Sequence, residues 1–223
     1  MSSPAFASTA DLGEKTVSFD EIGKGVYAYT AEGDPNSGIV VGDDSVLVFD
    51  AQATPTMAER VIAKVREVTD KPVSHVVLSH YHAVRVLGAP AYGAKEIVAS
   101  DAARAMIVER GEEDKASEIG RFPRLFQGAD SIRPGLTWPT TTFSHNASIW
   151  LGKREVRLMK LGRRLAVGEI AITAVGGGDG NRSHAPAQHG EPAAIRRGRD
   201  HGLPAPCAAP CPVSSSPTSA ILR

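Results

Sequence analysis

A strand–helix–strand succession over residues 45–78 constrains this chain more than any other feature. The run Ser45-Val46-Leu47-Val48-Phe49 favours a strand, and Thr54 and Pro55 then mark a helix start, because threonine caps exposed N–H groups and proline lacks one. Apolar residues recur along that helix at helical spacing, and the nearly continuous apolar run 73–78 suits an interior strand. Strands followed by alternating helix and strand predict an α/β fold with helices outside the sheet.

Composition divides the chain near residue 175. The segment 176–223 is rich in Pro and Gly and contains no Phe, Trp, Tyr or Met, so it cannot bury enough apolar surface to offset about 1–2 kcal/mol per residue of backbone ordering. We therefore predict a flexible N-terminus over 1–15, an α/β domain over 16–175 and a disordered tail over 176–223. The tail is also typical of a shifted reading frame, an alternative that the coding DNA decides.

Charge and hydropathy limit the partners and the location. The 25 basic and 25 acidic side chains balance, which argues against a nucleic acid or an anionic membrane as partner. No apolar run approaches the roughly 18 residues that span a bilayer. The first residues lack the charged and apolar regions of a secretory signal. We expect a soluble protein of the cytoplasm.

Two histidines directly follow the interior strand, in the order Ser79-His80-Tyr81-His82. Loops at the carboxyl ends of strands in open α/β sheets face a crevice where ligands bind. Two imidazoles one residue apart can hold a metal ion there, but a stable zinc site needs three or four ligands. By spacing alone, metal ligands and ordinary hydrogen-bonded histidines both remain open.

A series of motifs along the chain also indicates a protein family. The series consists of Val40-Val41-Gly42-Asp43-Asp44, the strand followed by Asp50-Ala51, the helix after it, and the strand followed by the histidine pair. Over about residues 16–160 this series resembles the metallo-β-lactamase superfamily. The resemblance implies an αββα sandwich, of which this chain would hold the N-terminal half and a few further strands. It also implies a zinc or iron centre, often with two ions, whose bound hydroxide hydrolyses an ester, thioester or lactam-type bond.

The family's metal motif, H-x-H-x-D-H, is only partly present. His80 and His82 match its first two ligands, whereas Val84 stands at the aspartate and Arg85 at the last histidine. Leu165 stands where the family's next metal histidine belongs. The resemblance therefore implies one zinc or iron ion at most, or none, held by His80 and His82.

Two functions follow from this partial match. The first is a metallo-hydrolase-like protein with impaired activity towards a small-molecule substrate, and the alternative is a non-catalytic truncated or frameshifted remnant of the fold. The resemblance makes Asp50 a support of the site, and Tyr81 and Arg85 are candidates for substrate contact. No catalytic residue is assigned. An incomplete domain would leave a sheet edge uncovered, which favours self-association.

Two further expectations concern the elements and the core. The sequence predicts a helix capped by Asp101 that ends at Gly111. Because aromatic residues are few, Trp138 and Trp150 are expected in the core.

Overall fold

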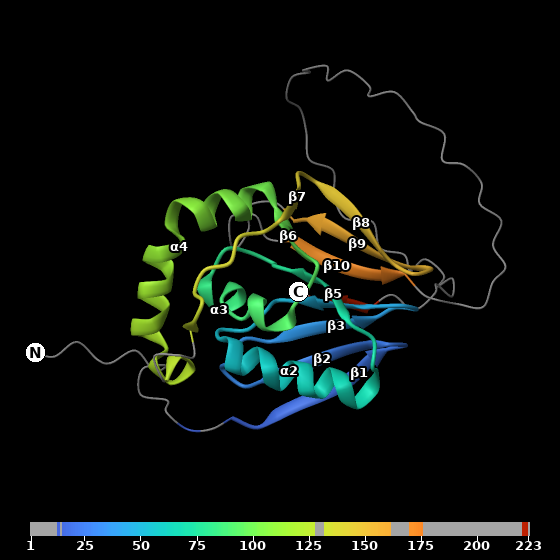
Figure 1. Cartoon of the computed structure of the whole chain (residues 1–223), viewed down its shortest axis with the longest axis horizontal. Helices are drawn as coiled ribbons and strands as arrows, with labels where there is room; N and C mark the ends of the chain where they lie inside the picture. Colours follow the sequence, from blue (N-terminus) through green and yellow to red (C-terminus); the bar gives the residue numbers. More distant parts are fainter. Residues whose placement is uncertain (1–12, 14, 128–131, 162–169, 176–219, 223) are drawn as a thin grey trace, which may run out of the picture. The chain divides into compact units, whose positions relative to one another are not determined.

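A seven-stranded sheet with the strand order β1-β2-β3-β4-β5-β6-β7 runs through the protein (Figure 1). The computed structural model describes residues 13, 15–127, 132–161, 170–175 and 220–222. These residues all belong to one compact unit, and a second unit, Gly178–Pro217, lies outside the described residues.

The first four strands form an antiparallel meander. They are β1 (Val17–Gly23), β2 (Val26–Ala31), β3 (Ser37–Val41) and β4 (Val46–Phe49). The strands β3 and β4 are buried along almost their whole length because both faces of the sheet are covered there. This matches the continuous apolar character of their sequences.

The second half of the sheet is parallel. Helix α2 (Pro55–Val68) connects β4 to β5 (Val73–Val77), and its N-cap Thr54 accepts a hydrogen bond from the N–H of Met57 at 3.1 Å. The short α3 (Ala83–Val86) and the turn η1 (Ala89–Tyr92) lead to β6 (Glu96–Ser100). Parallel pairing of β4, β5 and β6 places their carboxyl ends at one edge of the sheet.

The chain then forms a long helix and a second sheet. Helix α4 (Asp101–Arg121) and the turn η2 (Pro123–Phe126) precede β7 (Thr141–Phe143), the last strand of the large sheet. The antiparallel second sheet, of order β11-β10-β9-β8, is built from β8 (Asn146–Leu151), β9 (Arg154–Lys160), β10 (Ile170–Val175) and β11 (Ala220–Leu222).

Two apolar clusters hold these layers together. One lies between the large sheet and the helices and includes Val61, Val76 and Ile107. The other lies between the two sheets and joins Leu47 and Val77 of the large sheet to Leu158 and Ile172 of the small one. Among the described residues the order is therefore helices, large sheet, small sheet, which is the α/β sandwich that the sequence predicted without its last helical layer.

The structure corrects several sequence expectations. Ser100 rather than Asp101 caps α4, which continues through Gly111 to Arg121. Trp138 and Trp150 are exposed rather than in the core, and Trp150 lies on the outer face of β8. Ala220–Leu222, which the sequence placed in the tail, form β11 and pair with β10. The rest of the tail, 176–219 and 223, lies outside the described residues.

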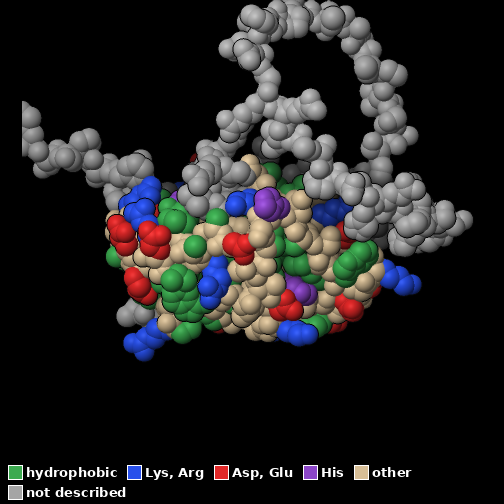
Figure 2. Space-filling model, turned by 90° about the horizontal axis from the view of Figure 1, so that it is seen from above, with side chains coloured by type: hydrophobic (Ala, Val, Ile, Leu, Met, Phe, Trp, Pro, Cys, Tyr) green, Lys and Arg blue, Asp and Glu red, His purple; other side chains and the backbone are tan. Residues whose placement is uncertain are grey.

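The surface agrees with the balanced composition. On the face that Figure 2 shows, the described acidic and basic side chains are interspersed with apolar ones, and neither sign forms a continuous patch. No helix within the described residues is long and apolar enough to cross a membrane.

Candidate functional site

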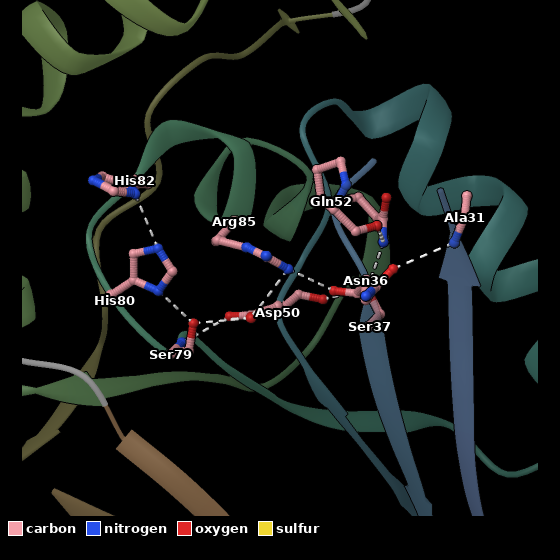
Figure 3. A network of polar contacts seen from close by, with 10 residues as sticks. Ala31, Asn36, Ser37, Asp50, Gln52, Ser79, His80, His82 and Arg85 are labelled. Atoms are coloured by element: carbon pink, nitrogen blue, oxygen red, sulfur yellow. Dashed lines mark hydrogen bonds and ion pairs between the residues drawn. The ribbon is translucent and has the colours of Figure 1, made fainter. Parts of the chain in front are cut away.

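The candidate site lies where β4 and β5 end side by side. Asp50 follows β4, and Ser79, His80 and His82 follow β5, immediately before α3 begins (Figure 3). Because the two strands are parallel neighbours, residues 29 or more positions apart in the sequence meet at one sheet edge. The topology thus brings together Asp50 and the histidine pair.

Asp50 is held in an unusual conformation. Its φ of 66° lies in the left-handed region that residues with a side chain seldom adopt, and Gln52 repeats this with a φ of 73°. Hydrogen bonds enforce the geometry, since the Ser37 hydroxyl donates to the Asp50 carbonyl oxygen at 2.6 Å and the Gln52 amide donates to Ser37 Oγ at 2.8 Å. Such strain persists only where the surrounding structure determines it, and it is frequent at functional sites.

The Asp50 carboxylate is buried but satisfied. Its Oδ1 accepts a hydrogen bond from the Ser79 N–H at 2.8 Å, and its Oδ2 accepts one from the Ser79 hydroxyl at 2.9 Å. Burial raises the pKa of Asp50, while the charge of Arg85 and the two bonds from Ser79 oppose that rise. Arg85 and Ser79 therefore favour the ionised form of this buried acid.

A chain of hydrogen bonds runs from Asp50 to His82. Ser79 Oγ and His80 Nδ1 are 2.7 Å apart, and His80 Nε2 and His82 Nδ1 are 3.1 Å apart (Figure 3). The single proton of the Ser79 hydroxyl is directed to Asp50, so His80 Nδ1 must donate to the hydroxyl oxygen, and His80 Nε2 must then accept from His82 Nδ1. Burial, followed by the charges of His82 and Arg85, lowers the pKa of His80 to about 3, which keeps this imidazole neutral.

Arg85 turns back from α3 towards Asp50. Its Nη1 donates to the carbonyl oxygen of Asn36 at 2.9 Å and lies 3.5 Å from Asp50 Oδ2 (Figure 3). The carbonyl oxygen of Arg85 also accepts the Ala51 N–H at 2.9 Å. The guanidinium thus places a positive charge beside the strand-end aspartate.

A cavity of about 240 Å³ opens beside these residues. His80, His82 and Arg85 line it, together with Glu118 and Arg121 from the last turn of α4. Glu118 is only 4% exposed, and its Oε1 accepts a hydrogen bond from Arg121 at 2.8 Å. Burial raises the pKa of Glu118, and Arg121 opposes the rise.

Sequence reasoning missed three of these residues. Glu118 and Arg121 carried no signal, because the helix that brings them to the site was expected to end at Gly111. Ser79 could have been found, since it adjoins the histidine pair and its hydroxyl can join a carboxylate to an imidazole.

The described residues do not fit the zinc or iron centre that the resemblance implies. The two facing imidazole nitrogens, 3.1 Å apart, are close to the spacing of about 3.3 Å for two ligands of one tetrahedral zinc ion. Val84 offers no donor, however, and Arg85 brings a cation to the neighbouring position. No group of three or more His, Cys, Asp or Glu side chains in the described ranges could hold a metal ion. Leu165, at the family's next ligand position, lies outside those ranges.

The two candidates for substrate contact are placed differently. Arg85 lines the cavity. Tyr81 instead packs against the apolar cluster beneath the helices and sets its ring edge to face with that of His82, with centroids 4.6 Å apart. Tyr81 is not among the described residues that line this cavity.

Several solved structures that share this fold are metallo-β-lactamases. The enzyme from Pontibacter korlensis matches with a TM-score of 0.53 and 14% identity, over 70% of this chain and 66% of that protein. The enzyme from Hirschia baltica matches with a TM-score of 0.50 and 17% identity, over 70% and 65%. A Cronobacter sakazakii metallo-β-lactamase described by its HARLDQ motif matches with a TM-score of 0.52 and 15% identity, over 70% and 54%.

These matches establish the fold, and this chain spans about two thirds or less of the length of those proteins. A comparison with curated proteins gives no match. The family model of the metallo-beta-lactamase superfamily matches residues 30–156, which is more than half of the chain and includes the whole strand-end site. The chain belongs to the metallo-beta-lactamase superfamily.

Proposed function

We propose that this chain is a metallo-β-lactamase-fold protein in which metal-dependent hydrolysis of an ester, thioester or lactam-type bond is strongly impaired or absent. The observation that carries the proposal is the ion pair between Arg85 and Asp50, with Arg85 at the position of the family's last motif histidine. A guanidinium fixed there repels a divalent ion, and it replaces a ligand as well.

The incomplete donor set supports the same conclusion. Catalytic zinc sites in general use three protein ligands and an open position for water. His80 and His82 supply two, and the hydrophobic Val84 cannot orient or deprotonate an attacking water. The similar Cronobacter sakazakii protein is described by the motif HARLDQ, which also departs from H-x-H-x-D-H but keeps the aspartate that Val84 replaces here. This chain lacks the last two residues of the motif together.

Metal analysis and turnover test the proposal. Purified full-length protein, loaded with zinc and then dialysed, is expected to retain substoichiometric zinc. Hydrolysis of p-nitrophenyl acetate, a thioester and a chromogenic β-lactam should not respond to a chelator. Stoichiometric zinc that is lost in the variant His80→Ala/His82→Ala, together with turnover that a chelator abolishes, would contradict the proposal.

A gain-of-function variant makes the test sharper. The double variant Val84→Asp/Arg85→His restores the motif, so its zinc retention should rise above that of the parent chain. The variant Val84→Asn/Arg85→Gln removes the arginine and changes both positions without adding the carboxylate or the third imidazole, and it serves as the matched control. Equal zinc retention by the two variants would show that these positions do not limit metal binding.

A further inference from the structure

The cavity beside the histidine pair has two chemically different ends. Its walls combine apolar side chains, among them Pro35, Val84 and Leu125, with the ionisable groups of the site. Its volume of about 240 Å³ lies below the range of roughly 300–1,000 Å³ that is typical of pockets for drug-sized ligands. A ligand of this cavity must therefore be small.

Arg85 forms the donor end. Its Nη1 is occupied by Asn36 and Asp50, whereas its Nε and Nη2 make no hydrogen bond within the described part of the chain. The edge of a guanidinium formed by Nε and Nη2 presents two parallel N–H groups, which match the two oxygens of a carboxylate.

His82 and Glu118 form the acceptor end. The hydrogen-bond chain from Asp50 uses His82 Nδ1 as a donor, so Nε2 is the ring nitrogen left to accept a hydrogen bond, and it points away from His80 (Figure 3). Glu118 Oε1 is bonded to Arg121, and Oε2 accepts no hydrogen bond from a described residue. The other acid of the cavity, Asp34, is paired with Arg124.

We propose that this cavity binds a small zwitterionic amino acid, with its carboxylate on Arg85 and its ammonium group on Glu118 and His82. A simple anion would leave the carboxylate of Glu118 facing it, and a simple amine would leave the open edge of Arg85 without a partner. A ligand that carries both charged groups on one carbon atom satisfies both ends. The proposal rests on the proposed function, because a metal ion on the histidines would occupy the acceptor end.

Isothermal titration calorimetry of the full-length protein tests the proposal with glycine and L-alanine as probes. Propionate and ethylamine, which each keep one charge of alanine, are the comparison ligands. We expect L-alanine or glycine to bind at least about tenfold more tightly than either comparison ligand, because each charge-assisted contact contributes roughly a factor of ten or more. Binding of propionate as tight as that of L-alanine would overturn the zwitterion assignment, as would no binding of either amino acid.

Variants separate the two ends from a folding defect. Arg85→Gln and Glu118→Gln should each weaken binding at least about tenfold, whereas Arg110→Gln, on the exposed surface of α4, should leave it unchanged. Val84→Phe fills the cavity without altering a charge and should abolish binding, and circular dichroism and urea unfolding identify any variant that is not folded. Unchanged affinity in folded Arg85→Gln and Glu118→Gln would overturn the proposal.

Parallel zinc analysis distinguishes the two proposals. If the protein retains stoichiometric zinc, the proposed function fails. If it retains none and still binds neither amino acid, only the ligand assignment fails.

Discussion

Burial lowers the pKa of two imidazoles of this protein. The pKa of His80 falls to about 3, and the pKa of His75 is also lowered, chiefly by burial and further by Lys95, against the opposing charge of Glu96. His75 lies in β5, where its Nδ1 and the Ser74 hydroxyl are 2.8 Å apart. A histidine whose pKa is lower in the folded protein than in the unfolded chain makes stability depend on pH.

The variant His75→Gln should therefore reduce the acid sensitivity of the fold. Below a pH of about 6.5 the unfolded chain binds a proton at His75 that the folded protein does not yet bind, so the free energy of unfolding falls as pH drops towards the lowered folded pKa. One histidine of this kind changes the free energy of unfolding by at most about 1.4 kcal/mol per pH unit. Urea unfolding at several pH values between 7.5 and 5 measures the slope, which should be shallower in His75→Gln than in the parent chain. An equal slope in the two proteins would contradict the prediction.

Residue identity alone indicated part of the site. Val84 and Arg85 can be read directly against the metal motif, so the sequence alone indicates which two residues of that motif are replaced. The pairing of Arg85 with Asp50 was not predictable, because Asp50 lies 35 positions earlier and only the parallel pairing of β4 and β5 brings the two together. The place of Glu118 in the site was also not predictable from local sequence, since it depends on the length of α4.

Local patterns predicted the elements with strong signals and missed the others. Thr54 and Pro55 marked the start of α2 correctly because capping depends on neighbouring residues. Gly111 did not end α4, since its φ is not left-handed and it packs against Leu136 instead. The strand β10 is held by pairing with β9 and β11, which no local pattern reports.

Helix α4 contains two glycines, the buried Gly111 and the exposed Gly120. Replacement by alanine should change the free energy of unfolding differently at the two positions. Nothing lies within 4 Å of a Cβ built on Gly120, so Gly120→Ala should raise the free energy of unfolding by up to about 1 kcal/mol through helix propensity. A Cβ on Gly111 would lie 2.9 Å from Leu136 Cδ1, and the displacement of Leu136 should offset that gain. Urea unfolding of both variants checks this, and an equal gain at the two positions would show that Leu136 moves aside freely.

At the scale of the molecule, the two sheets depend on a buried cation that has no carboxylate bonded to it among the described residues. Arg154 at the start of β9 is 7% exposed, and its Nη1 donates to the carbonyl oxygen of Val41 at 2.7 Å. Its Nη2 donates to the carbonyl oxygen of Lys24 at 2.6 Å. Burial lowers the pKa of Arg154, with the charge of Asp43 opposing. One side chain of the small sheet thereby satisfies two backbone segments of the large one.

Replacement of this arginine should loosen the contact between the sheets. Arg154→Met keeps much of the side-chain volume but leaves the carbonyl groups of Lys24 and Val41 without their donors, so the free energy of unfolding should fall by about 2–4 kcal/mol. Arg157→Met is the matched control, because Arg157 lies on the exposed face of the same strand and forms a surface ion pair with Glu155, so its loss should change stability by less than about 1 kcal/mol. Urea unfolding measures both variants. If Arg154→Met were as stable as the parent chain, the free energy gained by no longer burying a charge would equal the free energy lost with the hydrogen bonds. The apolar cluster between the sheets would then have to hold the small sheet in place alone.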